Sequence, residues 1–494
     1  MFTSYDIFQM NIKKIKKDPK QYKINETKRF GEPDNIDLIL EYNERGNKQL
    51  YLGEKYNQLK KLLSQQISLN KKNHNHDNSG NDEGKINTNS MNIDIDIMLD
   101  GLIGLLSKKN KKKMDNQENK EKTNNSQNEV RKIIENMSTS EMINLSQQID
   151  KKIEKLDFTY FSKRDELINK LGNILDSNVP LSNDEKDNEI IYTYTGKPLN
   201  ENIEKLYDHA DLGEKLGIIN SIAGTRVSGH RSYYLLAEGV ELSLALINYS
   251  LDFIKKYNYV PIQGPHFLNE ETMSKVSQLE DFKETLYQIN TSEKKDDPVK
   301  YSIATAEQFI TPYHYNHMFL KEELPEKFVG ISPCYRKESG AAGKDVRLPF
   351  RVHQFNKVEI FVTTTKDKSQ ETMVEMIEII KEFYESLGLS FRIVNIVSGA
   401  LNLAASKKCD LEGYFVATKQ YRELVSCSNV LDYFSKKLNI KDNKHNYVHM
   451  LNSTLCADTR TISCILEQYQ TNDGIIIPEK LRPYMRKDFI KFKK

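Results

Sequence analysis

The sequence contains no tryptophan and only five cysteines, all in the last third of its 494 residues. An odd number of cysteines without C-x-x-C spacing argues against a disulfide framework and a zinc knuckle, and it fits a reducing compartment. No apolar run reaches the roughly 18 residues that a membrane span needs. The first residues, MFTSYDIFQMNIKK, lack a signal-peptide stretch, so we expect a cytoplasmic protein without a membrane partner.

A strong charge of one sign is also absent, because basic and acidic residues nearly balance at a net charge of +2. Bulk charge therefore gives no evidence for a nucleic-acid partner. Apolar residues form 38% of the chain and charged residues 29%, which allows a large core in part of it. A chain of 494 residues exceeds the usual size of one core, so two or three domains are expected.

Two apolar stripes with helical spacing predict a long antiparallel helical hairpin, a coiled coil, within residues 1–180. The second stripe runs from Met142 to Ile174 and stops before Pro180. Each stripe can cover the other and leave lysine-rich outer faces. A purely structural coiled coil is the alternative interpretation. The first stripe contains Leu52, Tyr56, Leu59, Leu63 and Ile67.

The segment 73–128 between the stripes is rich in Asn, Lys, Asp and Ser. We expect it to be a disordered insertion, because it cannot bury enough apolar area to offset chain entropy. Within it, Ile93 to Lys113 form an apolar stretch followed by a basic run. This stretch predicts either a helix that docks on a membrane surface or a partner, or a short element packed on the neighbouring helices.

The composition changes after a polar linker at residues 181–204. Residues 205–494 combine short strand and helix patterns with Gly, Pro and aromatic residues, without a regular alternation of strands and helices. This pattern predicts an α+β fold, with an antiparallel β-sheet flanked by helices.

The stretch SPCYRKESGAAGKDVRLPFRVHQFNKVEIF, residues 332–361, places basic residues around a glycine-rich turn. The turn lacks the spacing and the Ser or Thr of a phosphate-binding P-loop. Alternation instead predicts a hairpin that presents Arg336 and Glu338 on one strand and Phe355 on the other. An arginine beside an aromatic ring can bind a phosphate and stack on a base. A surface hairpin with ordinary ion pairs is the alternative.

Three other stretches carry polar groups in patterns that fit a nucleotide and a small polar substrate. Thr305 and Glu307 share a strand face in IATAEQFITPYH. Glu423 and Ser426 in YRELVSCSN are candidate oxygen ligands for a phosphate-bound Mg²⁺. Arg460 lies in the first turn of a helix expected to start near Thr459, where the helix end favours anions.

The order of these stretches resembles a class II aminoacyl-tRNA synthetase, and their detail resembles the seryl-tRNA synthetases of the eukaryotic cytosolic type. YRELVSCSN, RVHQFNKVE and DTRTISCILEQYQ carry the resemblance, which covers nearly the whole chain outside the insertion. It implies a tRNA-binding arm domain at residues 1–180 and a catalytic domain at residues 205–494. It also places the three class II motifs at about 257–268, 332–361 and 451–470.

The resemblance further implies ATP, L-serine and tRNA-Ser as substrates, with Mg²⁺ accompanying ATP, and a homodimer built by the first motif. The residues implied as catalytic are Arg336, Glu338 and Arg460. The ATP-binding residues would be Arg336, Lys337, Glu338, Val352, Phe355, Glu423, Leu424, Val425, Ser426 and Arg460, with Glu423 and Ser426 nearest the metal. The serine-binding residues would be Thr305, Glu307, Arg336, Glu359, Asn452 and Thr454. The arm lysines that would contact tRNA are Lys60, Lys61, Lys151 and Lys152.

Four residues depart from the family pattern: Phe309, Pro333, Asn356 and Asp458. Asp458 either weakens the phosphate contact of Arg460 or points away from it. A catalytically inactive synthetase-like protein that binds tRNA or a regulatory partner is therefore the alternative function. A third interpretation makes the hairpin and its insertion a protein-interaction scaffold.

Overall fold

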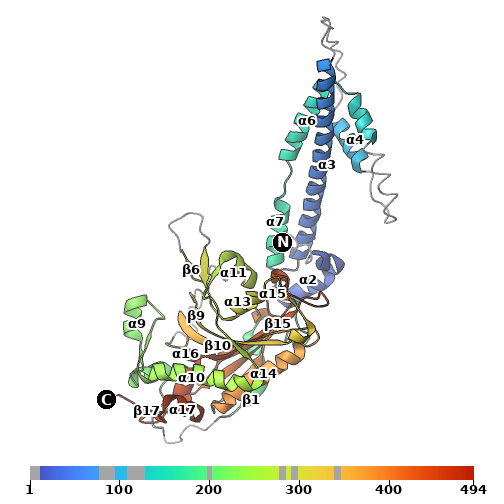
Figure 1. Ribbon diagram of the computed structural model, residues 1–494. Helices are drawn as coiled ribbons and strands as arrows, with labels where there is room; N and C mark the ends of the chain where they lie inside the picture. Colours follow the sequence, from blue (N-terminus) through green and yellow to red (C-terminus); the bar gives the residue numbers. More distant parts are fainter. Residues whose placement is uncertain are drawn as a thin grey trace. The chain divides into compact units, whose positions relative to one another are not determined.

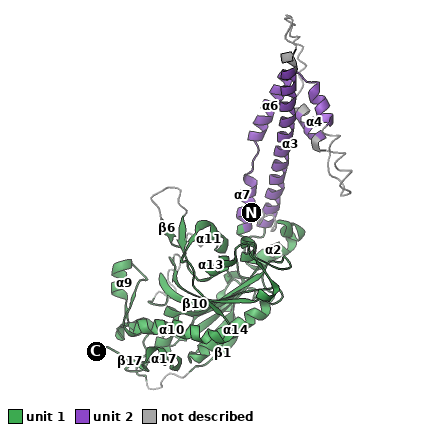
Figure 2. Cartoon of the chain, viewed as in Figure 1, with its two compact units in different colours: residues 1–34, 169–494 green, residues 35–168 purple. Residues whose placement is uncertain are grey.

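The computed structural model describes residues 12–76, 95–107, 128–196, 203–277, 285–290, 299–338 and 347–493. The chain forms two compact units, which Figure 2 shows in different colours. The larger comprises residues 1–34 and 169–494, and the smaller comprises residues 35–168. In the described part of the chain, no helix is long and apolar enough to cross a membrane.

The larger unit is built on an eight-stranded sheet in the order β1-β11-β12-β13-β15-β10-β9-β4 (Figure 1). Neighbouring strands are antiparallel except β4 and β9, which are parallel. The α+β prediction is confirmed, and the sheet is mixed because of this one edge pair. The strands are β1 Glu189–Tyr194, β4 Val260–Ile262, β9 Glu326–Tyr335, β10 Gln354–Thr364, β11 Phe391–Asn395, β12 Lys407–Phe415, β13 Gln420–Leu431 and β15 His449–Ala457.

The two faces of the sheet have different environments, which the central strand β10 makes clear. Its Val358 and Ile360 join the main core, whereas Phe361 joins a second core on the opposite face. Both faces are covered, so nearly every residue of the strand is buried. The helices of the main core are α10 Glu238–Ile254, α14 Ser369–Ser386 and α16 Asp458–Gln468. Those of the second core are α11 Glu270–Val276, α13 Glu307–Ile310 and α15 Tyr433–Leu438.

Shorter elements complete the larger unit. Three two-stranded sheets pair β2 Ile219–Asn220 with β3 Tyr234–Leu235, β8 Met318–Phe319 with β14 Lys441–Asp442, and β16 Gly474–Ile476 with β17 Phe489–Lys491. A three-stranded sheet has β7 Lys300–Ser302 between β5 Phe267–Asn269 and β6 Gln288–Ile289. The remaining helices are α2 Pro19–Lys28, α8 His209–Lys215, α9 Ser221–Ser228 and α17 Arg482–Met485. Helix α2 starts where Asp18 caps the backbone N–H of Gln21 and proline follows at the first turn.

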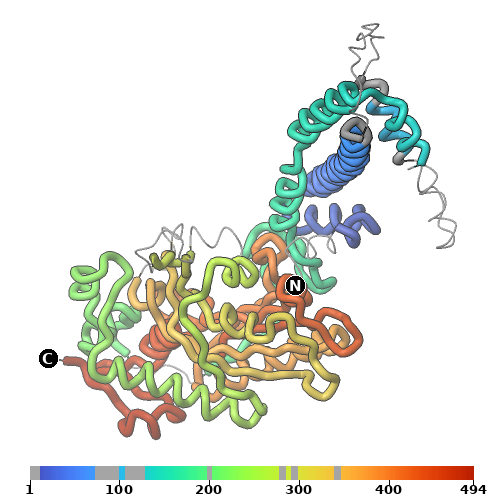
Figure 3. The backbone as a smooth tube through the Cα atoms, turned by 45° about the horizontal axis from the view of Figure 1, so that its top comes forward, coloured from blue at the N-terminus to red at the C-terminus, as the bar shows by residue number. Residues whose placement is uncertain are grey.

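The smaller unit is helical, and both predicted stripes contribute to one apolar cluster. Its elements are α3 Asn35–His76, α4 Ile95–Ser107, α6 Thr139–Glu154 and most of α7 Thr159–Asn169. A capping box between Ser138 and Glu141 starts α6. Figure 3 shows α4 and α6 on either side of α3. The cluster includes Tyr56, Leu59 and Leu63 of α3, Leu99 and Leu102 of α4, and Met142, Leu145 and Ile149 of α6.

Two predictions for this unit need correction. The second stripe is not one helix, because α6 ends at Glu154 and a new helix begins at Thr159, whose N–H donates to Asp157. The segment 73–128, expected to be disordered, contains α4, which packs on α3, as the interpretation of a short packed element predicted. Residues 77–94 and 108–127 of that segment lie outside the described residues.

Candidate active site

A cavity of about 420 Å³ lies on one face of the sheet, above β10, β13 and β15. The alternation within these strands directs polar side chains to it, with Glu359 opposite Thr454 and Ser428 opposite Asn452. Most of the residues predicted from separate stretches of the sequence line this one cavity. They are Thr305, Glu307, Arg336, Phe355, Glu359, Glu423, Leu424, Val425, Ser426, Asn452, Thr454 and Arg460.

A buried carboxylate organises one end of the cavity. Glu359 is 3% exposed, and its Oε2 accepts from the Thr305 hydroxyl at 2.5 Å and from the Glu307 backbone N–H at 3.1 Å. The Nζ of Lys357 lies 2.9 Å from the same oxygen. Lys357 was not predicted, although its position between Phe355 and Glu359 on one strand face could have revealed it. This end offers oxygen acceptors suited to a small ammonium group.

Two arginines, Arg336 and Arg460, line the cavity. Arg336 follows β9, and its Nε donates to the Ala304 carbonyl at 3.2 Å. Its guanidinium carbon lies 5.2 Å from the ring centre of Phe355, within cation–π distance. Arg460, in the first turn of α16, donates to the Glu423 carbonyl at 3.1 Å and lies 3.2 Å from its Oε1. The two cations can together hold an anion with several oxygens.

The pKa values of two carboxylates, Glu423 and Asp410, are shifted in opposite directions. Burial alone raises the pKa of Glu423, but Arg460, Lys408 and Arg336 outweigh burial and lower it to about 2. For Asp410, burial dominates and raises the pKa to about 7, although Lys408 Nζ lies 2.9 Å from its Oδ2. Glu423 therefore remains ionised at neutral pH and is suited to a cation. Lys408 lines the cavity but was not predicted; alternation in KKCDLE would have placed it beside Asp410.

Three predicted residues do not line the cavity. Oε2 of Glu338 lies 3.0 Å from Nη1 of Arg351 and 3.6 Å from Nη1 of Arg231. The backbone φ of Glu338 is +52°. Lys337 donates its backbone N–H to the Thr285 carbonyl, and Val352 is buried in the same apolar cluster as Phe355. The turn at residues 339–346, which we expect to order when ATP or the tRNA acceptor end binds, lies outside the described residues.

The structure also shows where the departures from the family pattern lie. Asp458 is 1% exposed. It accepts from the backbone and side-chain nitrogens of Asn356, both at 3.0 Å, and from Ser243 Oγ at 2.7 Å. Asn356 and Asp458, two of the departures from the family pattern, are therefore hydrogen-bond partners of each other. Phe309 belongs to the second core, and Pro333 lies opposite Asn356 in the β9–β10 pair.

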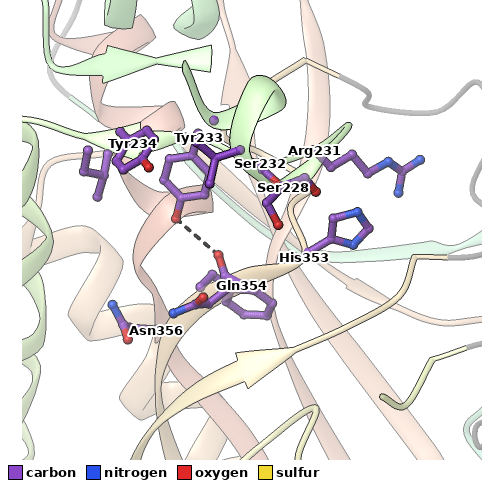
Figure 4. A pocket seen from close by; sticks show the side chains of 12 residues that line it. Ser228, Arg231, Ser232, Tyr233, Tyr234, His353, Gln354 and Asn356 are labelled. Carbon is purple, nitrogen blue, oxygen red and sulfur yellow. Dashed lines mark hydrogen bonds between the residues drawn. The ribbon is translucent and has the colours of Figure 1, made fainter. Parts of the chain in front are cut away.

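A second cavity of about 380 Å³ adjoins Phe355 and Asn356 (Figure 4). Arg231 and Tyr233 line it together with His353 and Gln354 of the hairpin, and the Tyr233 hydroxyl donates to the Gln354 carbonyl at 3.2 Å. Burial raises the pKa of Tyr233, so this hydroxyl stays protonated.

The predicted arm lysines lie in the smaller unit. Lys60 forms an ion pair with Asp150, whereas Lys61 and Lys151 are exposed and Lys152 is half-buried. No contact in this unit identifies what these lysines bind.

The fold and the cavity define a class II tRNA synthetase core, and residues 287–469 match the family described as tRNA synthetase class II core domain (G, H, P, S and T). The cytoplasmic serine–tRNA ligase of Dictyostelium discoideum is 45% identical over 368 residues, which are 72% of this chain and 80% of that protein. The chain belongs to the serine–tRNA ligase family.

Solved structures agree with this assignment. The crystal structure of the cytoplasmic serine–tRNA ligase of Naegleria fowleri in complex with AMP has a TM-score of 0.74 and 36% identity, covering 97% of each chain. The seryl-tRNA synthetase of Pyrococcus horikoshii complexed with ATP has a TM-score of 0.72 and 28% identity, covering 98% of this chain and 99% of that one.

Proposed function

We propose that this protein is a cytoplasmic serine–tRNA ligase. It activates L-serine with ATP to seryl-adenylate and pyrophosphate, and then transfers serine to the 3′ end of tRNA-Ser. The observation that carries this proposal is the single cavity in which Glu359 and Thr305 face one end while Arg336, Arg460 and Phe355 line the same space. One end suits an amino acid and the other a nucleotide triphosphate.

The serine end uses the buried carboxylate. Glu359, with Thr305 and Glu307, binds the α-ammonium, and Arg336 reaches the serine carboxylate. Asn452 and Thr454 are placed for the serine hydroxyl. A substrate without that hydroxyl leaves these buried polar groups unpaired, a type of rejection that can reach about 10⁴.

The ATP end supplies positive charge and a stacking surface. Adenine stacks on Phe355, Val352 lies against the nucleotide, and Arg336 and Arg460 bind phosphate oxygens. The segment from Glu423 to Ser426 contacts the nucleotide. Glu338 and Lys337 belong to the ATP site only if the hairpin rearranges, since Glu338 is held by Arg351 in this structure.

The chemistry of adenylate formation fits these side chains. The serine carboxylate is itself a nucleophile, so no general base is required, and the protein needs to neutralise charge at phosphorus and align the attack. Arg336 and Arg460 supply the neutralisation. Among the described residues, no cluster of three His, Cys, Asp or Glu side chains forms a metal site. One ionised carboxylate, Glu423, with the Ser426 hydroxyl fits a Mg²⁺ held mainly by phosphate oxygens, where the ion would add further charge neutralisation.

The smaller unit is proposed as the tRNA-binding arm. We infer that α3 pairs with α6 and α7 as an antiparallel hairpin, supported by the shared apolar cluster and by the Lys60–Asp150 ion pair. Gly46 supports close packing, because a Cβ there would lie 2.8 Å from the Phe161 ring. Lys61, Lys151 and Lys152, with Lys60, would contact tRNA phosphates.

A homodimer is proposed from exposed apolar side chains next to the first class II motif. Leu244 of α10 is 54% exposed, and Val260 and Phe267 within the motif are 57% and 51% exposed. Ile222 and Val227 of α9 are exposed by 71% and 70%. Exposed apolar side chains that form one patch mark protein–protein interfaces, and we propose that these side chains form such a patch.

Serine-dependent exchange of pyrophosphate into ATP tests the activity, followed by charging of tRNA-Ser. We expect exchange with serine and none with alanine or glycine at the same concentration. If exchange is absent while tRNA still binds, the protein is the inactive synthetase-like alternative. Deleting residues 73–127 would test the interpretation of the hairpin and its insertion as a protein-interaction scaffold. That interpretation predicts that aminoacylation is unchanged and that binding of a protein partner is lost.

A further inference from the structure

One wall of the cavity is an irregular segment, residues 401–405, in which every backbone carbonyl is bound by Arg29 or Asn173. Arg29 Nη2 donates to the carbonyls of Asn402 at 2.6 Å and Leu401 at 3.4 Å, and its Nη1 donates to Ala405 at 3.0 Å. Asn173 donates its backbone N–H to the carbonyl of residue 403 at 2.7 Å and its Nδ2 to that of residue 404 at 2.9 Å. Two residues, Arg29 and Asn173, thus replace the hydrogen bonds that a helix or strand would supply.

The two residues that hold this wall also hold each other. Arg29 Nη1 donates to the Asn173 carbonyl at 3.2 Å, and the Asn25 side chain donates to the same carbonyl at 3.1 Å. The Glu26 carboxylate accepts the backbone N–H of Gly172 at 3.1 Å. Arg29 and Asn173 are each 8% exposed. These residues therefore form a buried, hydrogen-bonded cluster between the C-terminal end of α2 and the segment after α7, and not a surface ion pair.

The wall borders the amino-acid end of the cavity. Asn402 and Ala404 line the cavity directly. Ala404 belongs to the same apolar cluster as Ala304 and Ala306, which flank Thr305 in the sequence, whereas Phe355 belongs to a different cluster. A displaced wall would therefore alter the space beside Thr305 before it altered the stacking surface.

We propose that Arg29 and Asn173 are positioning residues that fix the 401–405 wall and thereby set the affinity for the amino acid. This inference rests on the proposed function and adds a role for the residue that ends α2, far away in sequence from every predicted residue of the cavity. Arg29 acts through the backbone carbonyls of the wall and does not touch the substrate.

Two variants perturb the cluster in different ways. Arg29→Lys keeps the positive charge but loses the planar fork that reaches several carbonyls at once. Gly172→Ala keeps Arg29 but places a Cβ within 2.0 Å of its Nε, so the guanidinium must move. Lys28→Ala, at the exposed neighbouring position on α2, is the matched control.

The readouts are the KM values for serine and ATP in pyrophosphate exchange, and hydrogen–deuterium exchange of a peptide covering 401–405. For both variants we expect a serine KM raised about tenfold with an ATP KM within about twofold, because a wall shifted by about 1 Å misplaces the substrate. We also expect faster amide exchange in that peptide.

The inference is overturned if the serine KM matches that of Lys28→Ala, or if both KM values and the melting temperature change together, as in a merely structural role. If the wild-type protein shows no exchange with serine, the proposed function fails instead. The amide exchange, measured without substrate, then still reports whether Arg29 holds the wall.

Discussion

At the scale of single residues, Arg336 joins the two ends of the cavity. Its guanidinium lies over Phe355, and its Nε bonds to the carbonyl next to Thr305. The hairpin alternation predicted this arginine and this ring together, because their strands pair over ten positions of β9 and β10. The same alternation could not predict Lys357 as the partner of Glu359, since it shows which residues share a face but not which ions pair.

We expect Arg336→Ala to lower serine-dependent pyrophosphate exchange by at least about 10²-fold, because the variant loses charge stabilisation at phosphorus. The melting temperature should stay close to that of the wild type. Arg392→Ala is the control, because Arg392 pairs with Glu412 on β11 and β12 and does not line the cavity. Near-normal exchange in Arg336→Ala would remove this residue from its proposed role.

At the scale of secondary-structure elements, Asp458 connects three of them. It lies at the start of α16, bonds to Asn356 on β10 and bonds to Ser243 on α10. Asn356 follows Phe355 directly, and Arg460 lies two residues after Asp458. This one carboxylate therefore connects the start of α16, which carries Arg460, to the end of β10 that carries Phe355.

Placing a second carboxylate at this junction should push β10 away from α16. We expect Asn356→Glu to raise the KM for ATP about tenfold, a cost of about 1.4 kcal/mol, with a smaller effect on the KM for serine. The exchanged double variant Asn356→Glu/Asp458→Asn again has one carboxylate and one amide, so it should recover most of the ATP affinity. A wild-type ATP KM in the single variant would show that this connection does not affect ATP binding.

At the scale of the whole molecule, the proposed arm makes tRNA affinity dependent on salt. Each lysine that neutralises a phosphate contributes to the slope of log K against log salt concentration. Replacing Lys61 and Lys151 by Gln should weaken tRNA binding and reduce that slope by about 2, while leaving pyrophosphate exchange unchanged.

The matched control for the arm is Lys186→Gln, because Lys186 is exposed but belongs to the larger unit, outside the proposed arm. Titrations of tRNA-Ser at several salt concentrations provide the measurement. An unchanged slope in the Lys61→Gln/Lys151→Gln variant would mean that this surface does not bind tRNA.

The proposed dimer gives a second prediction at this scale. Val240 and Leu244 lie one turn apart on α10 and are 42% and 54% exposed. Leu244→Arg should shift the protein towards monomer in sedimentation velocity, because a buried unpaired charge opposes association. Val374→Arg, on α14 at a position that is 62% exposed, is the control. A dimer that persists in Leu244→Arg would place the interface elsewhere.

The sequence by itself determined the α+β class and the helical stripes, because each depends on a period of 2 or 3.6 residues along the chain. The resemblance to a known family, and not a period, supplied Glu359, Asn452 and Thr454. Only the tertiary structure decided that Asp458 turns to Asn356, that the second stripe breaks before Thr159, and that Arg29 reaches the wall at residues 401–405. The Asp458–Asn356 and Arg29–Asn402 hydrogen bonds join residues that are 102 and 373 positions apart in the sequence. No local period records such pairings, since they depend on how packed elements meet.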